Sequence, residues 1–518
     1  MINLEAGLYM WILDELKKMS DSDRTAVIHR DRQLSFKALW EGSEKIAQYI
    51  QKHTVTKNPV LIYGNKDVEI VEIMMGSLKS GRAYVPIDIT FPVERVRQIM
   101  EITETELIFN ISDMPINTND AAKVIGSDEC NEILNSGDYA VSYETDWVQG
   151  EDNCYILFTS GSTGTPKGVQ ISKNNILNFV NWFGKQAAVS GEVVLNQVSY
   201  SFDVSVIQLY LYLAMGKTLF SIDKKMISDF GELFTFLKSS DIASWISTPA
   251  FIEMCAVYDA FNRELLPKLE KIILAGEVLT KKLTVSLWEK IPGVEVINGY
   301  GPTEGTVLLT ACTITRDMVE DEENELPIGK ILDGAEYTID KNIEKDNPVA
   351  GAAENKGELV VSSASISKGY FKNEEATAKS FFKEENKQYN SYRTGDVVYE
   401  NNGMIYYCGR KDFQIKLNGY RIELDDISAN INKIDGVENN IILPVYRDGR
   451  VAYIAAFLIL NMQIWGGCSK VQRTVSIRKK LAEMLPSYMI PKKLIVLDKF
   501  PLNVNGKIDR KVLQEEYL

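Results

Sequence analysis

The sequence is poor in the residues that identify several common kinds of site. Among its 518 residues it has only two histidines, His29 and His53, and its six cysteines lie far apart with no Cys-x-x-Cys pair. That spacing argues against a zinc site and against a redox dithiol. The sequence also lacks a run of about 18 apolar residues and a basic segment ahead of an apolar one near its start. We therefore expect a cytoplasmic protein with reduced thiols, no membrane insertion and no catalytic histidine.

Basic charge is scarce as well. The chain has 57 Lys and Arg against 71 Asp and Glu, a net charge of −14, so its field repels nucleic acid and we expect no nucleic-acid partner. The balance is uneven, because residues 413–518 carry 16 basic and 11 acidic residues, or +5, which leaves −19 for residues 1–412. This basic segment is either chance variation in a small lobe or a face for polyphosphate or an acidic partner.

The chain has enough apolar residues for several large cores. It is 45% hydrophobic and 25% charged, an ordinary globular composition that excludes a disordered or collagen-like chain. At roughly 150 residues per domain it has room for about three folding units. Strand-like and helical patterns alternate, as at residues 59–63 and 68–78, and again at 271–274 and 280–290. This alternation predicts a layered α/β fold with a parallel sheet.

The pattern of predicted helices and strands changes in the last third of the chain. From about Gly357, β-runs with turn signals predict a β-rich subdomain. The residues after 412 predict helices at 424–434 and 471–485 and strands near 441–446 and 452–460, the pattern of a small α+β lobe. We therefore expect an N-terminal core of residues 1–411 and a C-terminal lobe of residues 412–518.

The most informative stretch is rich in threonine, serine and glycine. Residues 159–169 read Thr-Ser-Gly-Ser-Thr-Gly-Thr-Pro-Lys-Gly-Val. Small hydroxylic residues and glycines leave backbone N–H groups able to surround phosphate oxygens, and Lys167 adds a cation. It is not a Walker A loop, because Pro166 precedes the lysine and Gly168 follows it. A plain flexible turn is the alternative, but the length and the basic end favour phosphate binding.

With further motifs, the chain resembles the adenylate-forming superfamily of acyl- and amino-acid-activating enzymes along nearly its whole length. These motifs stand in family order: Leu78-Lys-Ser-Gly-Arg-Ala-Tyr-Val-Pro-Ile-Asp88, Ser201-Phe-Asp-Val-Ser205, Ala275-Gly-Glu277, Gly299-Tyr-Gly-Pro-Thr-Glu304, Tyr392-Arg-Thr-Gly-Asp396, Gly409-Arg-Lys-Asp-Phe-Gln-Ile-Lys416 and Asn505-Gly-Lys507. The resemblance implies a large N-terminal domain of layered α/β subdomains plus a β-rich subdomain. It also implies a mobile C-terminal lobe with a hinge near Asp412.

The resemblance further implies an ATP site that uses Mg²⁺. The residues that it assigns to ATP are Thr159, Ser160, Gly161, Ser162, Thr163, Gly164, Lys167, Gly276, Glu277, Asn298, Tyr300, Gly301, Thr303, Asp396, Arg410 and Lys507. In similar enzymes the residue matching Glu304 holds Mg²⁺, and those matching Tyr300 and Asp396 contact adenine and ribose. Thr159, Glu304 and Lys507 form the implied catalytic set, and the Lys507 ammonium would stabilise charge that grows at the α-phosphate.

Each of these roles has a plainer alternative. Thr303 could cap a helix whose dipole favours Glu304, Asp396 could be a turn aspartate after a glycine, and Lys507 could be a solvated charge. The chemistry itself needs no histidine, because a carboxylate with a pKa near 4 is already an ionised nucleophile at neutral pH. Its attack on the α-phosphate would yield an acyl-adenylate and pyrophosphate.

Asp203 bears on what is activated. Amino-acid-activating members of the family carry an aspartate here that pairs with the substrate ammonium, whereas fatty- and aryl-acid activators usually do not; its alternative role is a helix N-cap. The carried-over substrate pocket consists of Phe202, Asp203, Val204, Ile207, Ile273, Ala275, Gly299, Val307 and Leu308. A ligase of the acyl-CoA type acting on a non-amino acid is the other activity that the family offers.

Within the family the sequence resembles most plainly the ligases that load D-alanine onto a carrier protein. Those enzymes typically have cysteine in place of Ala275 and a bulkier residue in place of Gly299. Both departures predict a wider pocket, so a larger apolar or aromatic amino acid for nonribosomal peptide synthesis is nearly as good a prediction as D-alanine.

The implied acceptor is a phosphopantetheine thiol on a separate carrier protein. In similar enzymes the small lobe swings about its hinge and replaces the catalytic lysine by a strand that borders the pantetheine tunnel, here the strand with Lys416 and Gly419. The positive balance of residues 413–518 suits an acidic carrier.

Overall fold

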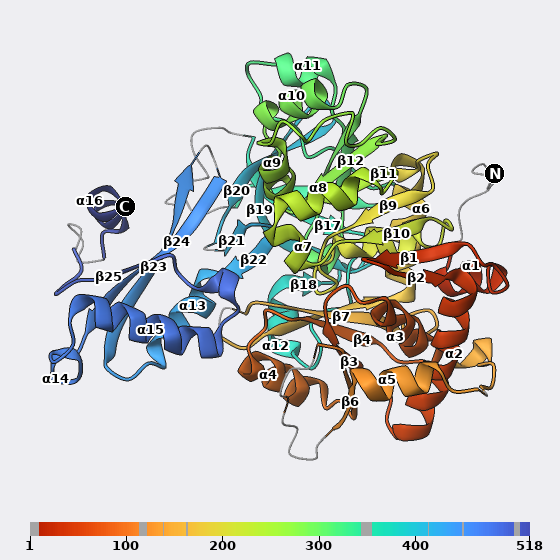
Figure 1. Cartoon of the computed structure of the whole chain (residues 1–518). Coiled ribbons are helices and arrows are strands. Elements are labelled where there is room, and N and C mark those ends of the chain that lie inside the picture. The colour runs from red at the N-terminus through yellow and green to blue at the C-terminus, as the bar shows by residue number, and fades with distance from the viewer. Residues whose placement is uncertain are drawn as a thin grey trace. The chain divides into compact units, whose positions relative to one another are not determined.

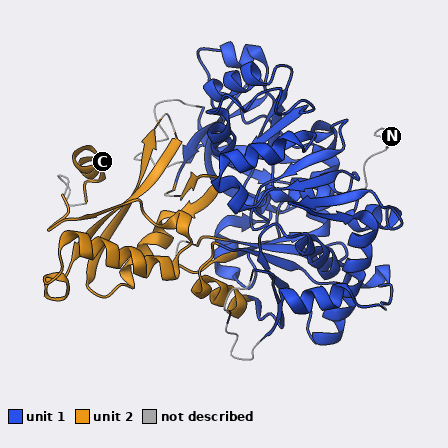
Figure 2. Cartoon of the chain, in the orientation of Figure 1, with its two compact units in different colours: residues 1–89, 103–158, 168–411 blue, residues 90–102, 159–167, 412–518 orange. Residues whose placement is uncertain are grey.

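The computed structural model describes residues 10–112, 116, 122–137, 139–161, 164–342, 355–412, 414–447, 450–501 and 508–518. By its contacts the chain divides into two compact units, which Figure 2 colours differently. The first unit comprises residues 1–89, 103–158 and 168–411, and the second comprises residues 90–102, 159–167 and 412–518. Most of the threonine-rich loop therefore groups with the C-terminal residues.

The first unit contains a six-stranded sheet whose strands β3, β4 and β5 are buried and apolar. Its order is β6 (Lys123–Gly126), β5 (Leu107–Asn110), β3 (Val60–Gly64), β4 (Tyr84–Asp88), β7 (Asn153–Thr159) and β8 (Lys167–Ser172). The strand β3 pairs in parallel with both β4 and β5, and all five residues of β4 are buried. Near-continuous apolar runs are typical of parallel strands covered on both faces.

A nine-stranded sheet forms the second layer of this unit (Figure 1). Its order is β15 (Lys330–Ile331), β14 (Thr310–Thr313), β13 (Glu295–Tyr300), β12 (Lys271–Ala275), β11 (Ile242–Ser247), β9 (Val193–Asn196), β10 (Thr218–Ser221), β1 (Thr25–His29) and β2 (Arg32–Ser35). The strands from β13 to β1 are parallel, whereas β14, β15 and β2 are antiparallel. In open α/β sheets, ligands bind at the carboxyl ends of parallel strands.

The helices of this unit alternate with the strands, as the sequence pattern predicts. They are α1 (Ile12–Lys18), α2 (Phe36–His53), α3 (Val68–Lys79), α5 (Ser127–Leu134), α6 (Lys173–Ala187), α7 (Lys224–Ser228), α8 (Phe230–Lys238), α9 (Pro249–Ala256), α10 (Lys281–Lys290), α11 (Arg316–Glu320) and α12 (Glu374–Ser380). In α10 the Thr280 side chain accepts a hydrogen bond from the Leu283 N–H, the expected N-cap. Where described, no helix is both long and apolar enough to cross a lipid bilayer.

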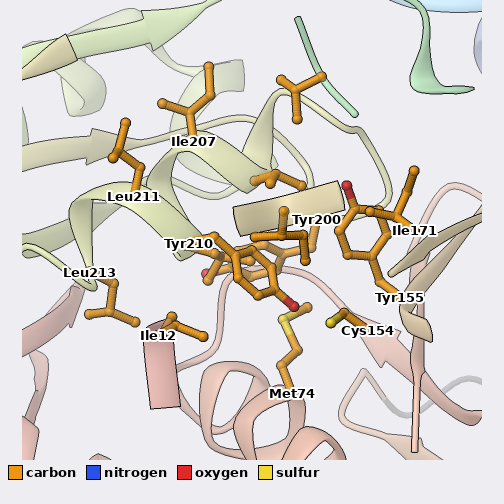
Figure 3. Close-up of a cluster of buried hydrophobic side chains, with 14 of the residues drawn as sticks. Ile12, Met74, Cys154, Tyr155, Ile171, Tyr200, Ile207, Tyr210, Leu211 and Leu213 are labelled. Carbon is orange, nitrogen blue, oxygen red and sulfur yellow. The ribbon is translucent and has the colours of Figure 1, made fainter. Parts of the chain in front are cut away.

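Aromatic side chains contribute much of the buried core of the first unit. Figure 3 shows Tyr155 of β7 close to Tyr210 of a π-helical turn, η2 (Ile207–Tyr212), and their ring centroids lie 6.1 Å apart. Tyr210 donates a hydrogen bond to the hydroxyl of Tyr84 on β4 at 3.0 Å. The six cysteines are all free thiols, as their spacing predicts, and four of them are buried.

A β-rich subdomain is present as predicted, but its first strand, β16, precedes Gly357. It is an antiparallel sheet of β16 (Glu336–Asp340), β17 (Gly357–Ser362), β19 (Ser391–Asn401) and β18 (Phe381–Phe382), with β20 (Met404–Arg410) pairing β19. In the register of β19 and β20, Asp396 lies opposite Arg410. This pairing sets a carboxylate beside a guanidinium.

The second unit has an α+β core of its own. Its sheet consists of β23 (Val437–Arg447), β24 (Arg450–Leu460) and β25 (Lys493–Val496), and its helices are α4 (Val93–Thr103), α13 (Leu424–Asn432), α14 (Met462–Trp465), α15 (Lys470–Met484) and α16 (Arg510–Tyr517). A hairpin joins β21 (Gln414–Leu417) to β22 (Tyr420–Glu423) through Asn418 and Gly419, whose φ angles are +51° and +81°. Asn-Gly is the preferred pair for such a two-residue turn.

Candidate active site

Three predicted nucleotide-binding residues meet at the end of β13. The Tyr300 hydroxyl donates to Asp396 Oδ2 at 2.5 Å, and Arg410 Nη1 donates to Asp396 Oδ1 at 2.8 Å. Asp396 lies inside β19 and is 2% exposed, so its alternative role as a turn aspartate is wrong. Burial, and after it the Asp396 carboxylate, raises the pKa of Tyr300 well above its usual value, so its hydroxyl stays protonated.

Glu304 is held in place by a tyrosine. It lies in the 3-10 turn η3 (Thr303–Gly305), is fully buried, and its Oε1 accepts a hydrogen bond from the Tyr370 hydroxyl at 2.7 Å. The turn has Pro302 at its N-cap and no side-chain cap, so the capping alternative is wrong. In the described ranges, no three His, Cys, Asp or Glu side chains gather as a ready metal cluster. A single hard carboxylate still fits Mg²⁺, which commonly uses one or two carboxylates plus substrate phosphates.

Asp203 is a buried carboxylate next to Val204, a residue of the main hydrophobic cluster. It is 8% exposed, and its Oδ2 accepts a hydrogen bond from the Thr303 hydroxyl at 2.6 Å. The following helical segment is the π-helical η2, which has Val206 at its N-cap and no side-chain cap. Residues 205–206 are already helical ahead of this turn, so the N-cap role of Asp203 stays a prediction beside its role as ammonium partner. Thr303 holds the Asp203 carboxylate in one orientation.

The predicted pocket residues belong to one buried hydrophobic cluster. It includes Val204, Ile207, Ile273, Ala275, Val307 and Leu308, with Phe202 packed against it. Gly299 lies beside Ala275 in the sheet register, and a Cβ atom built on Gly299 would lie 2.9 Å from both methyl carbons of Leu308. The expectation that Gly299 widens the pocket is therefore wrong, because the Leu308 side chain fills the space that the glycine leaves.

Val307 and Leu308 lie in and directly after a turn with a strained backbone. Thr306 and Val307 have φ angles of +56° and +71°, a conformation that costs a β-branched residue on the order of 1–3 kcal/mol. Thr306 donates its hydroxyl to the carbonyl of Ser365 at 2.6 Å. Gly301 is needed beside this turn, because a Cβ there would lie 2.4 Å from the Val307 carbonyl oxygen. Strain of this kind persists where the surrounding structure holds a functional residue in place.

Three other predicted ATP-site residues lie at or near the carboxyl ends of β12 and β13. The Asn298 amide donates to the Pro327 carbonyl at 2.8 Å, and Glu277 Oε2 accepts from the Ala250 N–H at 3.0 Å. Gly276 has a φ angle of +92° at the end of β12, where a side chain would be strained. Asn298 thus holds the loop at Pro327, and Glu277 accepts from the first turn of α9.

The remaining predicted residues belong to the second unit or lie outside the described residues. Thr159 donates its hydroxyl to the Lys167 carbonyl at 3.4 Å. Lys416 lies on β21, Gly419 in the hairpin turn, and Asp412 is exposed and accepts from the Gln414 N–H at 3.2 Å. Ser162, Thr163 and Lys507 fall outside the described residues, so their roles stay predictions.

Sequence reasoning missed Tyr370 and the link from Thr303 to Asp203. Tyr370 follows Gly369, which has a φ angle of +125°, but a tyrosine after a glycine is too common to indicate a site. The contact between Thr303 and Asp203 joins residues 100 positions apart. Neither pairing leaves a local pattern in the sequence.

Comparisons with known proteins identify the same kind of enzyme along nearly the whole chain. A model of the family "AMP-binding enzyme" matches residues 16–371. A D-alanine--D-alanyl carrier protein ligase of Bacillus licheniformis is 38% identical over 517 residues, covering 98% of this chain and 99% of the relative. One from Listeria monocytogenes is 38% identical over 488 residues, covering 93% of this chain and 94% of the relative.

Solved structures support the fold. The Vibrio cholerae adenylation domain AlmE, in complex with glycyl-adenosine-5'-phosphate, aligns with a TM-score of 0.80 at 21% identity, covering 100% of this chain and 98% of that one. PA1221, a nonribosomal peptide synthetase protein with adenylation and carrier domains, aligns with a TM-score of 0.78 at 21% identity, covering 99% of this chain and 85% of that one. These likenesses confirm the predicted fold class.

Proposed function

The chain belongs to the AMP-binding enzyme family, and on this premise we propose that it is an ATP-dependent ligase that joins D-alanine to a carrier protein. It would first form D-alanyl-adenylate and then transfer the D-alanyl group to a phosphopantetheine thiol. The name of the relatives at 38% identity, D-alanine--D-alanyl carrier protein ligase, supports both the substrate and the acceptor. The predicted resemblance to the adenylate-forming superfamily is thereby confirmed.

Two features together carry this proposal. The Asp203 carboxylate is buried, and the Leu308 side chain occupies the space beside Gly299 in the predicted substrate pocket. A buried carboxylate held by Thr303 is a suitable partner for a substrate ammonium, which would be costly to bury unpaired. Leu308 takes the space beside Gly299, which favours a small side chain such as the methyl group of alanine. A larger apolar amino acid would need Leu308 to move.

The first half-reaction is a displacement at phosphorus. A carboxylate oxygen of D-alanine forms a bond to the α-phosphorus of ATP, the bond from that phosphorus to the bridging oxygen breaks, and pyrophosphate leaves. Asp203 would hold the ammonium, and Asp396, with Tyr300 and Arg410 fixing its two oxygens, would accept from the ribose hydroxyls. Mg²⁺ held by Glu304 and the phosphates would offset their charge, and the Lys507 ammonium would stabilise charge at the α-phosphate.

In the second half-reaction the thiol sulfur bonds to the carbonyl carbon, the thiol proton is lost, and AMP leaves. The residues proposed to border the thiol's path are Lys416 and Gly419, after the lobe moves about Asp412. The first half-reaction consumes ATP and the second consumes the adenylate made from it. Because ATP is a cytoplasmic metabolite, we propose a cytoplasmic location. An acyl-CoA-type ligase is the weaker alternative, because a non-amino acid leaves Asp203 without a cationic partner.

Exchange of labelled pyrophosphate into ATP tests the proposal. With a panel of D- and L-amino acids, we expect D-alanine to support the fastest exchange and Lys507→Ala to reduce it by at least about 100-fold. Adding a phosphopantetheinylated carrier should then yield a D-alanyl thioester detectable by mass spectrometry. Turnover only with free coenzyme A and a fatty or aryl acid would overturn the proposal.

A further inference from the structure

The chain segment that leads to Asp203 lies outside the helices and strands. Residues 197–201 join the end of β9 to Phe202 and Asp203. Within this segment Val198 and Tyr200 are nevertheless buried. Because no ladder of backbone hydrogen bonds aligns such a segment, side chains from neighbouring elements have to hold it. Its conformation decides where the Asp203 carboxylate lies.

A buried lysine holds the first part of this segment. Lys66 follows β3 and is 1% exposed. Its Nζ donates to the Val198 carbonyl at 2.5 Å and lies 3.6 Å from the centre of the Tyr200 ring. The same Nζ donates to Asn196 Oδ1 at 2.8 Å. One ammonium therefore contacts three residues between the last position of β9 and Tyr200.

The amide of Asn196 extends these contacts to a third strand. Its Nδ2 donates to the Tyr200 hydroxyl at 2.8 Å and to the Ser221 hydroxyl at 2.9 Å. Asn196 is the last residue of β9, and Ser221 is the last residue of β10. Both strands belong to the nine-stranded sheet, whereas Lys66 follows a strand of the six-stranded sheet. The Lys66 contacts therefore connect the two sheets at the 197–201 segment.

A buried carboxylate holds the second part of the segment. Asp88 is the last residue of β4 and is 1% exposed. Its Oδ2 accepts a hydrogen bond from the Ser199 hydroxyl at 2.6 Å, and its Oδ1 accepts from Lys224 Nζ. The hydroxyl oxygens of Ser199 and Ser201 lie 3.1 Å apart. Because Ser199 gives its single hydroxyl proton to Asp88, Ser201 is the donor to Ser199.

The packing around these hydroxyls leaves little empty space. A cavity whose lining includes Asp88, Ser199 and Ser201 has a volume of about 10 Å³, enough for about one water molecule. The segment therefore has no room to shift on this side while its contacts with Asp88 remain.

Burying the Lys66 ammonium is costly. Burial lowers the pKa of Lys66 well below its usual value, and an apolar side chain of similar length would avoid that cost. Another buried lysine, Lys79 on α3, lies 2.8 Å from Glu44 Oε1 and 3.1 Å from the centre of the Trp40 ring, both on α2. The Lys79 contacts join two helices, whereas the Lys66 contacts lie on residues 196–200, just ahead of Asp203. This difference favours a role for Lys66 at the substrate site.

We propose that Lys66 and Asp88 are positioning residues, which fix the 197–201 segment from the six-stranded sheet and so hold the Asp203 carboxylate where the substrate ammonium binds. Thr303 fixes the carboxylate itself, and Lys66 and Asp88 fix the backbone that leads to it. Neither of them contacts the substrate. This inference rests on the proposed function, because it assumes that Asp203 binds the ammonium.

The expected consequence of losing these contacts is a weaker preference for an ammonium group. D-Lactate has a hydroxyl group where D-alanine has its ammonium, so the ratio of kcat/KM for the two substrates in pyrophosphate exchange measures the contribution of Asp203. If the segment shifts, this ratio should fall, because the attraction between two charges weakens with distance. A general loss of folded enzyme would lower both values by the same factor and leave the ratio unchanged.

The experiment compares Lys66→Met with Lys79→Met in the full chain, by pyrophosphate exchange with D-alanine and with D-lactate. Lys66→Met should raise the KM for D-alanine about tenfold, lower the preference for D-alanine over D-lactate by a similar factor, and keep the KM for ATP within about twofold. Lys79→Met also removes a buried ammonium, so it should lower the free energy of unfolding but leave the preference near the wild-type value. An unchanged preference in Lys66→Met, or an equal fall in both variants, overturns the inference.

A milder pair of variants covers the case in which either lysine variant fails to fold. Ser199→Ala removes the hydroxyl that Asp88 holds and should lower the same preference several-fold. Its control is Ser240→Ala, because Ser240 is a buried serine whose hydroxyl donates to the Leu237 carbonyl of α8 at 2.7 Å. The control should keep the wild-type preference. If Ser199→Ala keeps it as well, the inference is wrong.

Asp203→Asn separates this inference from the proposed function. Under the proposed function this variant should lose the preference for D-alanine over D-lactate. If it retains the wild-type preference, Asp203 does not bind the ammonium, and the proposed function is overturned together with the inference. If Asp203→Asn loses the preference while Lys66→Met and Ser199→Ala keep it, the proposed function stands and only the inference is overturned.

Discussion

At the scale of the residue, selectivity for an amino acid depends on the Asp203 carboxylate. We expect Asp203→Asn to raise the KM for D-alanine by about 100-fold or more, because the substrate ammonium would be buried without a charged partner. The KM for ATP should change much less, within about twofold, because Asp203 is proposed to contact the ammonium and no part of the nucleotide. Pyrophosphate exchange at varied D-alanine and varied ATP measures both constants.

Thr303→Val is the companion variant. It removes the hydroxyl that holds Asp203 Oδ2 and keeps the charge, so its effect on the same KM should be smaller, about tenfold. A larger effect from Thr303→Val than from Asp203→Asn would contradict the assignment of the ammonium to Asp203.

Leu308 should set the size of the accepted side chain. Leu308→Ala removes the branched group that lies against Gly299, so exchange supported by larger D-amino acids such as D-valine should rise relative to D-alanine. The cavity should also destabilise the fold by about 2–5 kcal/mol, measured by denaturant unfolding. A loss of stability with unchanged relative rates would show that Leu308 packs the core without bounding the substrate.

At the scale of the element, apolar runs were predictable from sequence and their partners were not. The runs at 59–63 and 271–274 became β3 and β12 because alternating strands and helices leave few other arrangements. Gly395 left open the alternative that Asp396 is a turn residue, yet Asp396 lies within β19. The local pattern records the glycine and carries no information on pairing with Arg410, which lies on another strand.

The packing of α2 on α3 predicts a dependence of stability on pH. A Cβ on Gly42 of α2 would lie 1.9 Å from Glu72 Oε1, and Glu72 is 5% exposed. Burial first, and Glu69 second, raises the pKa of Glu72 to about 8 from its usual 4.5. The folded state therefore binds this proton more tightly than the unfolded state, so the stabilisation is complete below pH 4.5 and is lost as the pH rises towards 8.

Glu72→Gln should remove this dependence. Between pH 5 and 8 the free energy of unfolding of wild type should fall relative to that of the variant, by about 1.4 kcal/mol for each pH unit. Urea unfolding at several pH values measures the difference, with the exposed Glu101→Gln as control. Parallel pH profiles for wild type and Glu72→Gln would rule out a protonated Glu72.

If the hairpin of β21 and β22 borders the path of the thiol, as we propose, it should affect only the second half-reaction. Gly419 has a φ angle of +81°, so Gly419→Val should strain the turn by about 1–2 kcal/mol and displace the strand with Lys416. Carrier loading should fall several-fold while pyrophosphate exchange remains, whereas Asn418→Gly, which suits the same turn, should change neither. Equal loss in both reactions from Gly419→Val would remove the hairpin from the second half-reaction.

At the scale of the whole molecule, two segments group with residues that lie far along the chain. Residues 90–102 and 159–167 belong by contact to the unit of residues 412–518. No composition shift or linker marks these segments, because their assignment depends on contacts such as those of Ser160 with β22. Periodicity reports the local element and its buried face, and it leaves such long-range pairings open.

The uneven charge of the molecule leads to a prediction about the carrier. Residues 413–518 carry 16 basic against 11 acidic residues in a chain of net charge −14, so this segment should attract an acidic carrier that the rest of the chain repels. Lys470 and Lys479 of α15 are exposed. Reversing both to glutamate should raise the KM for the carrier about tenfold at low salt and leave pyrophosphate exchange unchanged.

The control reverses Lys37 and Lys52, which are exposed on α2 in the first unit and give the same change in net charge. Their reversal should leave the KM for the carrier near the wild-type value if attraction is local to the basic segment. Because exposed charges are screened within about 8 Å at 0.15 M salt, the difference between the two double variants should shrink as salt is added. If both raise the KM equally, the net charge of the enzyme governs the encounter, and α15 has no special part in it.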